Sequence, residues 1–319
     1  MNILFRVDAS SKVGLGHLRR TLALAMELKR LGHGPVFLID ERGEKLPIRM
    51  PLSRIRGMGG RRWDLAVVDS YTILPKGYQK IRSATHRVAV VADGRDPGFD
   101  CDFLIDHNLY ASQKMYPAQQ GRETKLLVGP QYAMMSEEIV RARVEGFTVR
   151  DRIQKILLTL GGSTHPVETI RLLRMIAHIA QEVEMLIITP AQDFKSLLPS
   201  LLPHGNRYRV IPNPYEMGKV MRQADIAVTA AGVTSLELAC IGVPTICVVL
   251  SDNQRKGAQE ADRQGIGLNL GKPPDWKQSK FDLLYRALVK ADLRKSMSRK
   301  ARSLVDGRGV KRVALELVR

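Results

Sequence analysis

The chain lacks the features that would mark a secreted, metal-stapled or membrane-spanning protein. Its 319 residues include only three cysteines, Cys101, Cys240 and Cys247, and they are widely scattered. That number and spacing exclude a disulfide framework and a cysteine-based zinc site. No run of 18 apolar residues occurs, and the N-terminus has no charged segment followed by an apolar core. The sequence therefore predicts a cytoplasmic protein without a secretory signal or integral membrane contact.

Aromatic residues are also scarce, at 5% of the chain, whereas positive charge is abundant, with a formal net charge of +18. The basic residues are spread over both halves and are densest in 277–319. They do not alternate with aromatic residues, so we expect no nucleic-acid partner. We interpret most of them as solvated helix surface, with a binding site for an anion as the functional alternative. Weak peripheral association with an anionic membrane surface stays open.

Apolar runs alternate with helical patterns along the first half of the chain. Runs that are apolar throughout, rather than at every second residue, indicate a parallel sheet buried on both faces. The predicted strands are Ile3–Phe5, Pro35–Ile39, Leu65–Val68, Arg87–Val91, Phe103–Ile105 and Leu126–Val128. The predicted helices are Leu18–Leu31, Lys76–Ser83 and Ser136–Glu145.

The same alternation restarts after a polar, charged stretch at 147–155. The predicted strands are Ile156–Leu160, Met185–Ile188, Tyr208–Ile211, Ile226–Val228 and Thr245–Leu250. The predicted helices are Val167–Glu182, Val233–Ile241, Gln254–Gln264, Phe281–Val289, Asp292–Leu304 and Val310–Val318. Two such series predict an α/β protein with two Rossmann-like, doubly wound domains that face a cleft. We place them at 1–150 and 151–319, with a last helix that could cross back to the first domain.

A glycine-lined turn follows the first predicted strand and holds Gly14, Gly16 and His17. The glycines allow the backbone to approach a ligand closely, and the helix that follows offers unpaired N–H groups. A helix N-terminus also disfavours the imidazolium form, so His17 could accept a proton. The alternative is a histidine that only caps or packs the helix. The spacing is not a dinucleotide fingerprint, because Arg19 stands where a third glycine would be expected.

Two turns in the second half have the composition of an anion-binding site. Gly161, Gly162 and Ser163 follow one strand, and small residues before a helix follow another: Gly232, Val233, Thr234 and Ser235. Backbone N–H groups in such turns can surround a phosphate. Glu237 could bind a ribose diol or merely complement the helix dipole. Asn253 and Gln254 could fix sugar hydroxyls or cap a helix.

Acidic residues end three strands of the first half, at Asp69, Asp93 and Asp106. Each by itself is typical of a turn or cap. Three at one edge of a parallel sheet are more than solubility requires. We find no zinc-ligand spacing and no GxSxG elbow, so neither a metal nor a cofactor is expected.

Taken together and in this order, these segments resemble the UDP-sugar hydrolase family of the pseudaminic acid pathway. The resemblance runs from about residue 1 to 270. The matching segments are 8–20, Asp69-Ser70-Tyr71, Asp106-His107-Asn108, Val128 to Ala133, Gly161-Gly162-Ser163 and Asp252-Asn253-Gln254. The family has the GT-B fold, is similar to MurG-type glycosyltransferases, and shares its wider set with a spore coat polysaccharide biosynthesis group.

The resemblance implies roles for individual residues. His17 matches the general base that activates water against the anomeric carbon, beside Gly14, Gly16 and Arg19. UDP would lie on the second domain, with 232–235 at the phosphates and Glu237 at the ribose. Asn253 and Gln254 match positions near the sugar and the diphosphate, and Tyr71, Asn108 and Asp69 match the sugar side. No metal is implied, and the predicted partner is a UDP-sugar.

Three functions remain open from the sequence. The first is hydrolysis of a UDP-linked deoxyamino sugar of the 2,4-diacetamido-2,4,6-trideoxy-altropyranose type. The second is a glycosyltransferase that uses the same donor site, and the third is a sugar-nucleotide binding protein without catalysis. The chain departs from the hydrolase pattern at Thr164 to Pro166, at Ala231 and Leu236, and at Ala92.

Overall fold

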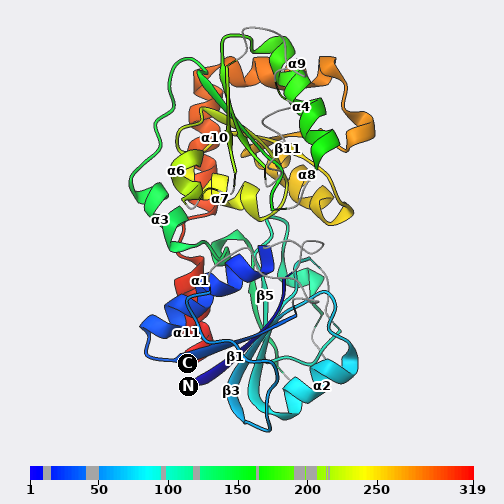
Figure 1. The fold of residues 1–319 in the computed structure, drawn as a ribbon, viewed down its shortest axis with the longest axis vertical. Helices are drawn as coiled ribbons and strands as arrows, with labels where there is room; N and C mark the ends of the chain where they lie inside the picture. The colour runs from blue at the N-terminus through cyan, green and yellow to red at the C-terminus, as the bar shows by residue number, and fades with distance from the viewer. Residues whose placement is uncertain are drawn as a thin grey trace. The chain divides into compact units, whose positions relative to one another are not determined.

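The structure is a computed structural model of the chain. It describes residues 1–9, 16–40, 50–94, 98–117, 123–162, 165–189, 198, 207–212, 214 and 216–319. The chain divides into two compact units (Figure 1). Unit 1 comprises Met1–Ser136 and Gly307–Arg319, and unit 2 comprises Glu137–Asp306.

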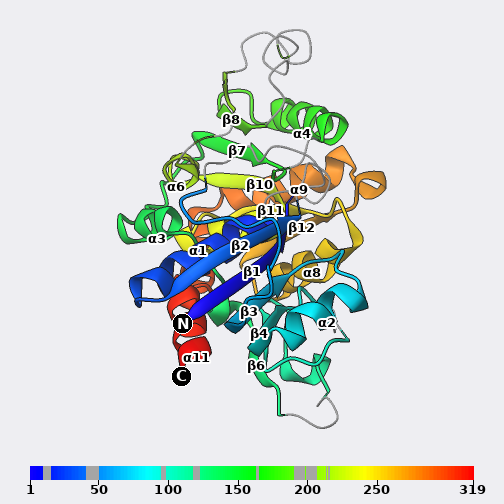
Figure 2. The same ribbon diagram turned by 60° about the horizontal axis from the view of Figure 1, so that its bottom comes forward.

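Unit 1 is built on a six-stranded sheet in the order β2-β1-β3-β4-β5-β6, and every neighbouring pair is parallel. Its strands are β1 (Asn2–Asp8), β2 (Gly34–Asp40), β3 (Trp63–Asp69), β4 (Thr85–Val91), β5 (Phe103–Asp106) and β6 (Lys125–Val128). Figure 2 shows β2, β1, β3 and β4 side by side in that order. The first strand therefore has the second on one side and the third on the other.

Both faces of this sheet are covered, which is why its strands are apolar throughout. Ile3 and Phe5 face the helices α1 (Gly16–Arg30) and α11 (Gly309–Val318), with which they form one apolar cluster. Leu4 faces the other way and packs in a second cluster with residues of α2 (Pro75–Ser83). Alternate residues of one strand thus serve two cores.

The last helix, α11, belongs to unit 1 although it ends the chain. Its Val313 and Leu317 share a core with α1, beside which it lies in Figures 1 and 2. Arg312 donates to the carbonyl of Gln131 at 2.8 Å. A Cβ on Gly309 would come within 2.2 Å of the Ala133 carbonyl oxygen, so this helix start requires a glycine.

Unit 2 has a second six-stranded parallel sheet, in the order β9-β8-β7-β10-β11-β12. This is the strand order of a dinucleotide-binding fold, with the first strand of the unit at the switch point. The strands are β7 (Lys155–Thr159), β8 (Glu184–Ile188), β9 (Tyr208–Ile211), β10 (Ile226–Ala230), β11 (Thr245–Val248) and β12 (Gly267–Gly271). Figure 2 labels them across the sheet from β8 to β12.

Helices cover this second sheet as well. They are α3 (Glu137–Val144), α4 (Pro166–Ile179), α6 (Met217–Met221), α7 (Val233–Ile241), α8 (Arg255–Arg263), α9 (Gln278–Val289) and α10 (Ala291–Leu304). Residues of α4, α9 and α10 pack in one apolar cluster with the strands, around Ile156, Leu158 and Phe281. No helix of the described residues is long and apolar enough to cross a membrane.

The structure differs from the sequence prediction at the unit boundary and at two small elements. The chain divides between Ser136 and Glu137, whereas the sequence suggested residue 150. The reason is that α3 packs in unit 2, where Glu138 accepts from the Gly218 N–H at 2.9 Å. Strand β12 and helix α6 were not predicted. Two glycines and an asparagine give β12 a composition unusual for a strand, and α6 has only five residues.

Candidate functional site

The residues of unit 1 that could take part in chemistry gather where the order of its strands reverses, between β1 and β3. The chain leaves β1 through α1 to reach β2 on one side, and β3 pairs with β1 on the other. His17 lies in the first turn of α1, and Asp69 ends β3. Open parallel sheets bind their ligands at the carboxyl ends of strands at such a switch point. Topology therefore brings together two residues that are 52 positions apart in sequence.

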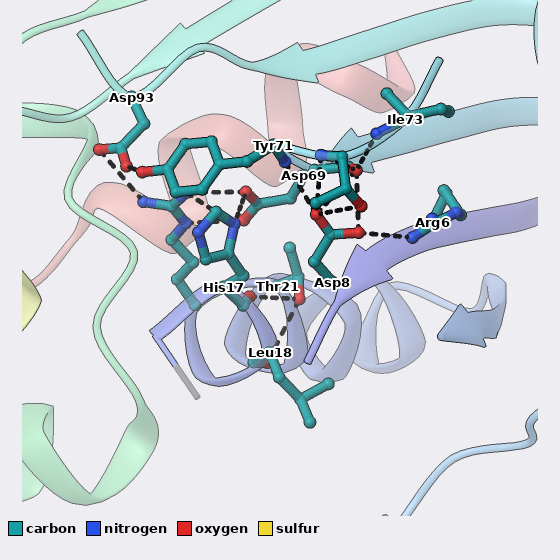
Figure 3. Close-up of polar contacts among 12 residues, drawn as sticks. Arg6, Asp8, His17, Leu18, Thr21, Asp69, Tyr71, Ile73 and Asp93 are labelled. Atoms are coloured by element: carbon teal, nitrogen blue, oxygen red, sulfur yellow. Dashed lines mark hydrogen bonds and ion pairs between the residues drawn. The ribbon is translucent and has the colours of Figure 1, made fainter. Parts of the chain in front are cut away.

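His17 and Asp69 form a buried pair (Figure 3). The imidazole Nδ1 lies 2.5 Å from Asp69 Oδ1, and the two residues are 5% and 0% exposed. Because a carboxylate only accepts hydrogen bonds, we assign the proton to Nδ1. No described residue bonds Nε2, so that nitrogen is the proton acceptor of the ring.

Arg20 holds the carboxylate of this pair from the other side. Its Nε donates to Asp69 Oδ2 at 2.6 Å and its Nη2 to Oδ1 at 2.7 Å, a two-pronged contact. Burial alone would favour a neutral Asp69, but Arg20 and His17 hold the pKa of this carboxyl well below its usual range. Asp69 is therefore an anion at neutral pH, although no solvent reaches it.

Tyr71 and Asp93 continue the network. The hydroxyl of Tyr71 donates to Asp93 Oδ2, and its ring meets the imidazole of His17 edge to face at 4.5 Å (Figure 3). Asp93 Oδ1 lies 3.6 Å from Arg20 Nη1. Asp93 also adopts a left-handed backbone with φ of 48°, which is uncommon outside glycine and favoured by aspartate among the exceptions.

Two further strand-end carboxylates organise loops. Asp8 accepts from Ser70 Oγ and from the backbone N–H groups of Tyr71 and Thr72, and so shapes the turn after β3. Asp106 does the same beyond β4 and β5: it accepts from the N–H groups of Gly94 and Asn108 and from the Tyr116 hydroxyl at 2.6 Å.

Asn108 and His107 follow β5 and lie beside Asp106 at the same edge of the sheet. The side-chain amide of Asn108 donates to Asp106 at 2.7 Å and to Asp93 at 3.1 Å, so it ties the two carboxylates together. His107 is buried and its Nδ1 has no partner among the described residues. Burial and the nearby charge of Arg20 lower the pKa of His107 to about 4, so it is neutral at neutral pH.

The sequence-predicted residues of unit 1 fall into three groups. The structure brings His17, Asp69, Tyr71 and Asn108 into one network. Gly16 begins α1, and Gly14 lies outside the described residues. Arg19 is exposed, and the arginine that reaches Asp69 is Arg20. The signal for Arg20 is its distance of three residues from His17, which puts both on one face of a helix.

Unit 2 has a different kind of edge at its own switch point. Strand β10 runs through Ala230 into α7, and Gly232 precedes that helix without a side-chain cap. Val233, Thr234 and Ser235 form the first turn, in which Ser235 donates back to the Gly232 carbonyl at 2.7 Å. A helix start of this kind presents N–H groups and positive potential to an anion.

Of the predicted residues on neighbouring strand ends, Gln254 lies beside this helix start. Gln254 accepts from the Leu250 N–H at 2.9 Å, and its Nε2 lies 3.9 Å from where a Cβ on Gly232 would stand. Asn253 is exposed and accepts from Ser251 Oγ at 2.5 Å. Gly161, beyond the end of β7, has a φ of 94°, and Gly162 next to it is exposed. Ser163 lies outside the described residues.

Glu237 stands one turn into α7 and is buried. Among the described residues no cluster of three or more histidines, cysteines or acids could hold a metal ion.

Comparison with known proteins defines the class to which this architecture belongs. Residues 156–303 match the glycosyltransferase family 28 C-terminal domain. The fold is similar to the crystal structure of MurG from Acinetobacter baumannii, with a TM-score of 0.70 and 17% identity over 99% of both chains. The chain therefore has the GT-B fold, as the sequence predicted.

Two curated relatives show which known proteins the whole sequence is similar to. The chain is 25% identical to the spore coat polysaccharide biosynthesis protein SpsG of Bacillus subtilis, over 98% of this chain and 96% of that protein. It is also 25% identical to the UDP-2,4-diacetamido-2,4,6-trideoxy-beta-L-altropyranose hydrolase of Campylobacter jejuni. That match covers 51% of this chain and 61% of the hydrolase. The resemblance drawn from the sequence motifs is thereby confirmed.

Proposed function

We propose that this protein hydrolyses a UDP-linked deoxyamino sugar to UDP and the free sugar, for nonulosonic acid or surface polysaccharide biosynthesis. The observation that carries the proposal is the buried His17–Asp69 pair at the switch point of unit 1. A histidine whose Nδ1 is bound by a carboxylate, and whose Nε2 has no partner among the described residues, has the arrangement of a general base.

The proposed reaction uses water as the nucleophile. Nε2 of His17 takes a proton from water, and the water oxygen attacks the anomeric carbon. The bond from that carbon to the UDP oxygen breaks, and UDP leaves with the electron pair. The amides at the start of α7 stabilise the charge that develops on the diphosphate, and Glu237 accepts from the ribose hydroxyls. Gly16, Arg19, Tyr71, Asn108, Asn253 and Gln254 are proposed to contact the sugar-nucleotide.

A glycosyltransferase is the second candidate. The match of 156–303 to the glycosyltransferase family 28 C-terminal domain favours it. Both candidates use the same donor and base. They differ in whether water or an acceptor hydroxyl takes the sugar.

The test is incubation with UDP-sugars in the absence of any acceptor. We expect release of UDP from UDP-2,4-diacetamido-2,4,6-trideoxy-altropyranose and little from UDP-N-acetylglucosamine. In heavy-oxygen water the label should enter the free sugar. Label in UDP instead would show attack at phosphorus and contradict the mechanism. Turnover only after addition of an acceptor would establish the transferase, and binding without any turnover would establish a binding protein.

His17→Ala sharpens this test. We expect turnover to fall by about two to four orders of magnitude, the usual contribution of a general base. UDP affinity measured by calorimetry should stay unchanged, because the proposed UDP contacts lie in unit 2. Retained turnover in this variant would remove His17 from the mechanism.

A further inference from the structure

Four carboxylates meet at the carboxyl edge of the unit 1 sheet, and they divide into two pairs. Asp8 and Asp106 accept from backbone N–H groups and from side-chain donors of the turns that they shape, and Asp8 also pairs with Arg6. Asp69 and Asp93 instead face aromatic rings of the candidate site, His17 and Tyr71. Both carboxylates of this second pair lie next to the same positively charged side chain, that of Arg20.

Arg20 contacts both members of this second pair. Its Nε and Nη2 hold the two oxygens of Asp69 at 2.6 and 2.7 Å, and its Nη1 lies 3.6 Å from Asp93 Oδ1. The residue is 2% exposed, so this charge has no solvent to stabilise it. A buried arginine persists only where it is paired, and here its partners are the carboxylates behind the candidate base.

We propose that Arg20 is a positioning residue for the base His17, holding Asp69 by both oxygens so that one of them faces the imidazole Nδ1. This inference rests on the proposed function. Arg20 itself does not touch the reacting atoms. It acts through Asp69, by restricting the carboxylate to one orientation and the imidazole to the tautomer that leaves Nε2 unprotonated.

The same contact controls where the proton of the pair resides. Oδ1 of Asp69 is shared by His17 and Arg20, and Arg20 Nη2 lies 3.4 Å from the imidazole Nδ1. Without the guanidinium, the full negative charge of a buried Asp69 would act on the imidazole and favour its protonated form. A protonated His17 cannot accept a proton from water, so the enzyme would become active only at higher pH.

Other titratable groups surround the pair, and the charge of Arg20 lowers the pKa of Asp93 and of His107. Asp93 approaches from the end of β4, and Tyr71 from the turn after β3. His107 and Asp106 lie at the end of β5 and interact electrostatically with Arg20. His107 is neutral at neutral pH. Besides Asp69, the negative charge that Arg20 offsets is therefore that of Asp93.

The experiment compares Arg20→Met, Arg20→Lys and the control Arg30→Met. Arg30 lies on the same helix but is exposed and paired with Glu27. UDP release is measured from pH 5 to 10, with near-ultraviolet circular dichroism and UDP binding as checks on folding. For Arg20→Met we expect a lower kcat at neutral pH, an unchanged KM, and an acid limb of the pH–rate profile moved to higher pH. The deficit should then shrink by about tenfold per pH unit along that limb.

Arg20→Lys keeps the positive charge but removes the planar guanidinium that contacts both oxygens of Asp69. We expect it to restore the position of the acid limb while kcat stays below the wild-type value. An equal loss of activity by Arg20→Met at every pH, in a folded variant, would overturn the proposal, as would an unchanged kcat.

A second readout does not depend on turnover. Imidazole nitrogen shifts of His17, measured by NMR at neutral pH, should show the Nδ1–H tautomer in the wild type and a protonated ring in Arg20→Met. If the wild type releases no UDP but these shifts change as expected, the proposed function fails while the positioning role stands. If UDP is released and the shifts are identical in both proteins, the positioning role is wrong.

Discussion

The two units have closely related strand orders but opposite chemistry at the edge where ligands bind. In unit 1 four carboxylates, Arg20 and two histidines meet there, most of them buried. In unit 2 the corresponding edge presents an uncapped helix start, hydroxyls and the amide of Gln254, with Glu237 as a buried acid. The comparison teaches that a doubly wound sheet sets where a ligand can bind, whereas the side chains at the strand ends set what is done to it.

The two edges differ in the kind of charge that they carry: paired ionised side chains in unit 1, and the partial charges of backbone amides in unit 2. Unit 1 can keep ionised groups out of water because each is matched: Asp69 by Arg20 and His17, and Asp106 by N–H and hydroxyl donors. The edge of unit 2 is suited to a ligand that brings its own negative charge, because its amides supply only partial positive charge. One architecture can thus carry both the proposed base and the proposed diphosphate site.

The largest expected effect separates the two kinds of carboxylate within unit 1. In Asp69→Asn the amide can donate to Nδ1, which favours the wrong imidazole tautomer. We expect UDP release to fall by on the order of a thousandfold. Asp8→Asn removes a buried carboxylate that shapes the turn after β3 and pairs with Arg6 but does not contact His17, so it should lower the free energy of unfolding and leave kcat nearly unchanged. Equal kcat values for the two variants, measured where both are folded, would erase this distinction.

A smaller effect is expected at the unit 2 edge. Glu237→Ala removes the proposed acceptor for the ribose hydroxyls, and hydrogen bonds to a charged group contribute about 1.5–3 kcal/mol. Calorimetry should therefore show UDP affinity reduced by roughly ten- to a hundredfold. The control Glu260→Ala removes an acid of α8 that pairs with Arg263, and it should bind UDP as the wild type does. An unchanged affinity in Glu237→Ala would exclude the ribose contact.

The smallest effect concerns stability rather than activity, and it too distinguishes the units. Burial lowers the pKa of His107 from 6.5 to about 4, so the unfolded chain binds a proton more readily than the folded one. This contribution to stability is complete above pH 6.5 and is lost as pH falls toward 4. We expect His107→Gln to flatten this part of the pH dependence, which has a slope of up to about 1.4 kcal/mol per pH unit.

The measurement can be confined to unit 1, because each unit has one tryptophan, Trp63 in unit 1 and Trp276 in unit 2. Trp276→Phe leaves Trp63 as the fluorescent reporter for urea unfolding. A variant that kept the full loss between pH 6.5 and 4 would assign this loss to other groups. The low pKa of Asp69 acts in the same direction but at lower pH, as its carboxylate is protonated only in stronger acid.

Much of the fold could be predicted because it is encoded locally. The predicted strands reappear with ends that differ by at most three residues, since a sheet buried on both faces needs apolar residues throughout. Strand β12 was missed because its glycines and asparagine are disfavoured in strands, and pairing with β11 outweighs that preference. The unit boundary depends on which surface α3 packs against, which no local pattern reports.

The candidate site was only partly predictable, for a similar reason. His17 and Asp69 were named separately, but their contact requires two strands to be neighbours. Arg19 and Arg20 are adjacent and chemically identical, and only the rotation of α1 decides that Arg20 points to the buried carboxylate. The role of a strand-end acid was likewise undecided between Asp8, which forms a turn, and Asp69, which holds the histidine.

The amino-acid sequence by itself determined the two doubly wound units, the glycine turns and the strand ends that carry polar residues. These depend on hydrophobic periodicity and on backbone freedom, which act over a few residues. Only the tertiary structure decided which acid meets which base, because burial and charge pairing arise between groups that are distant along the chain. The ionisation of Asp69 and the orientation of His17 are properties of that packing.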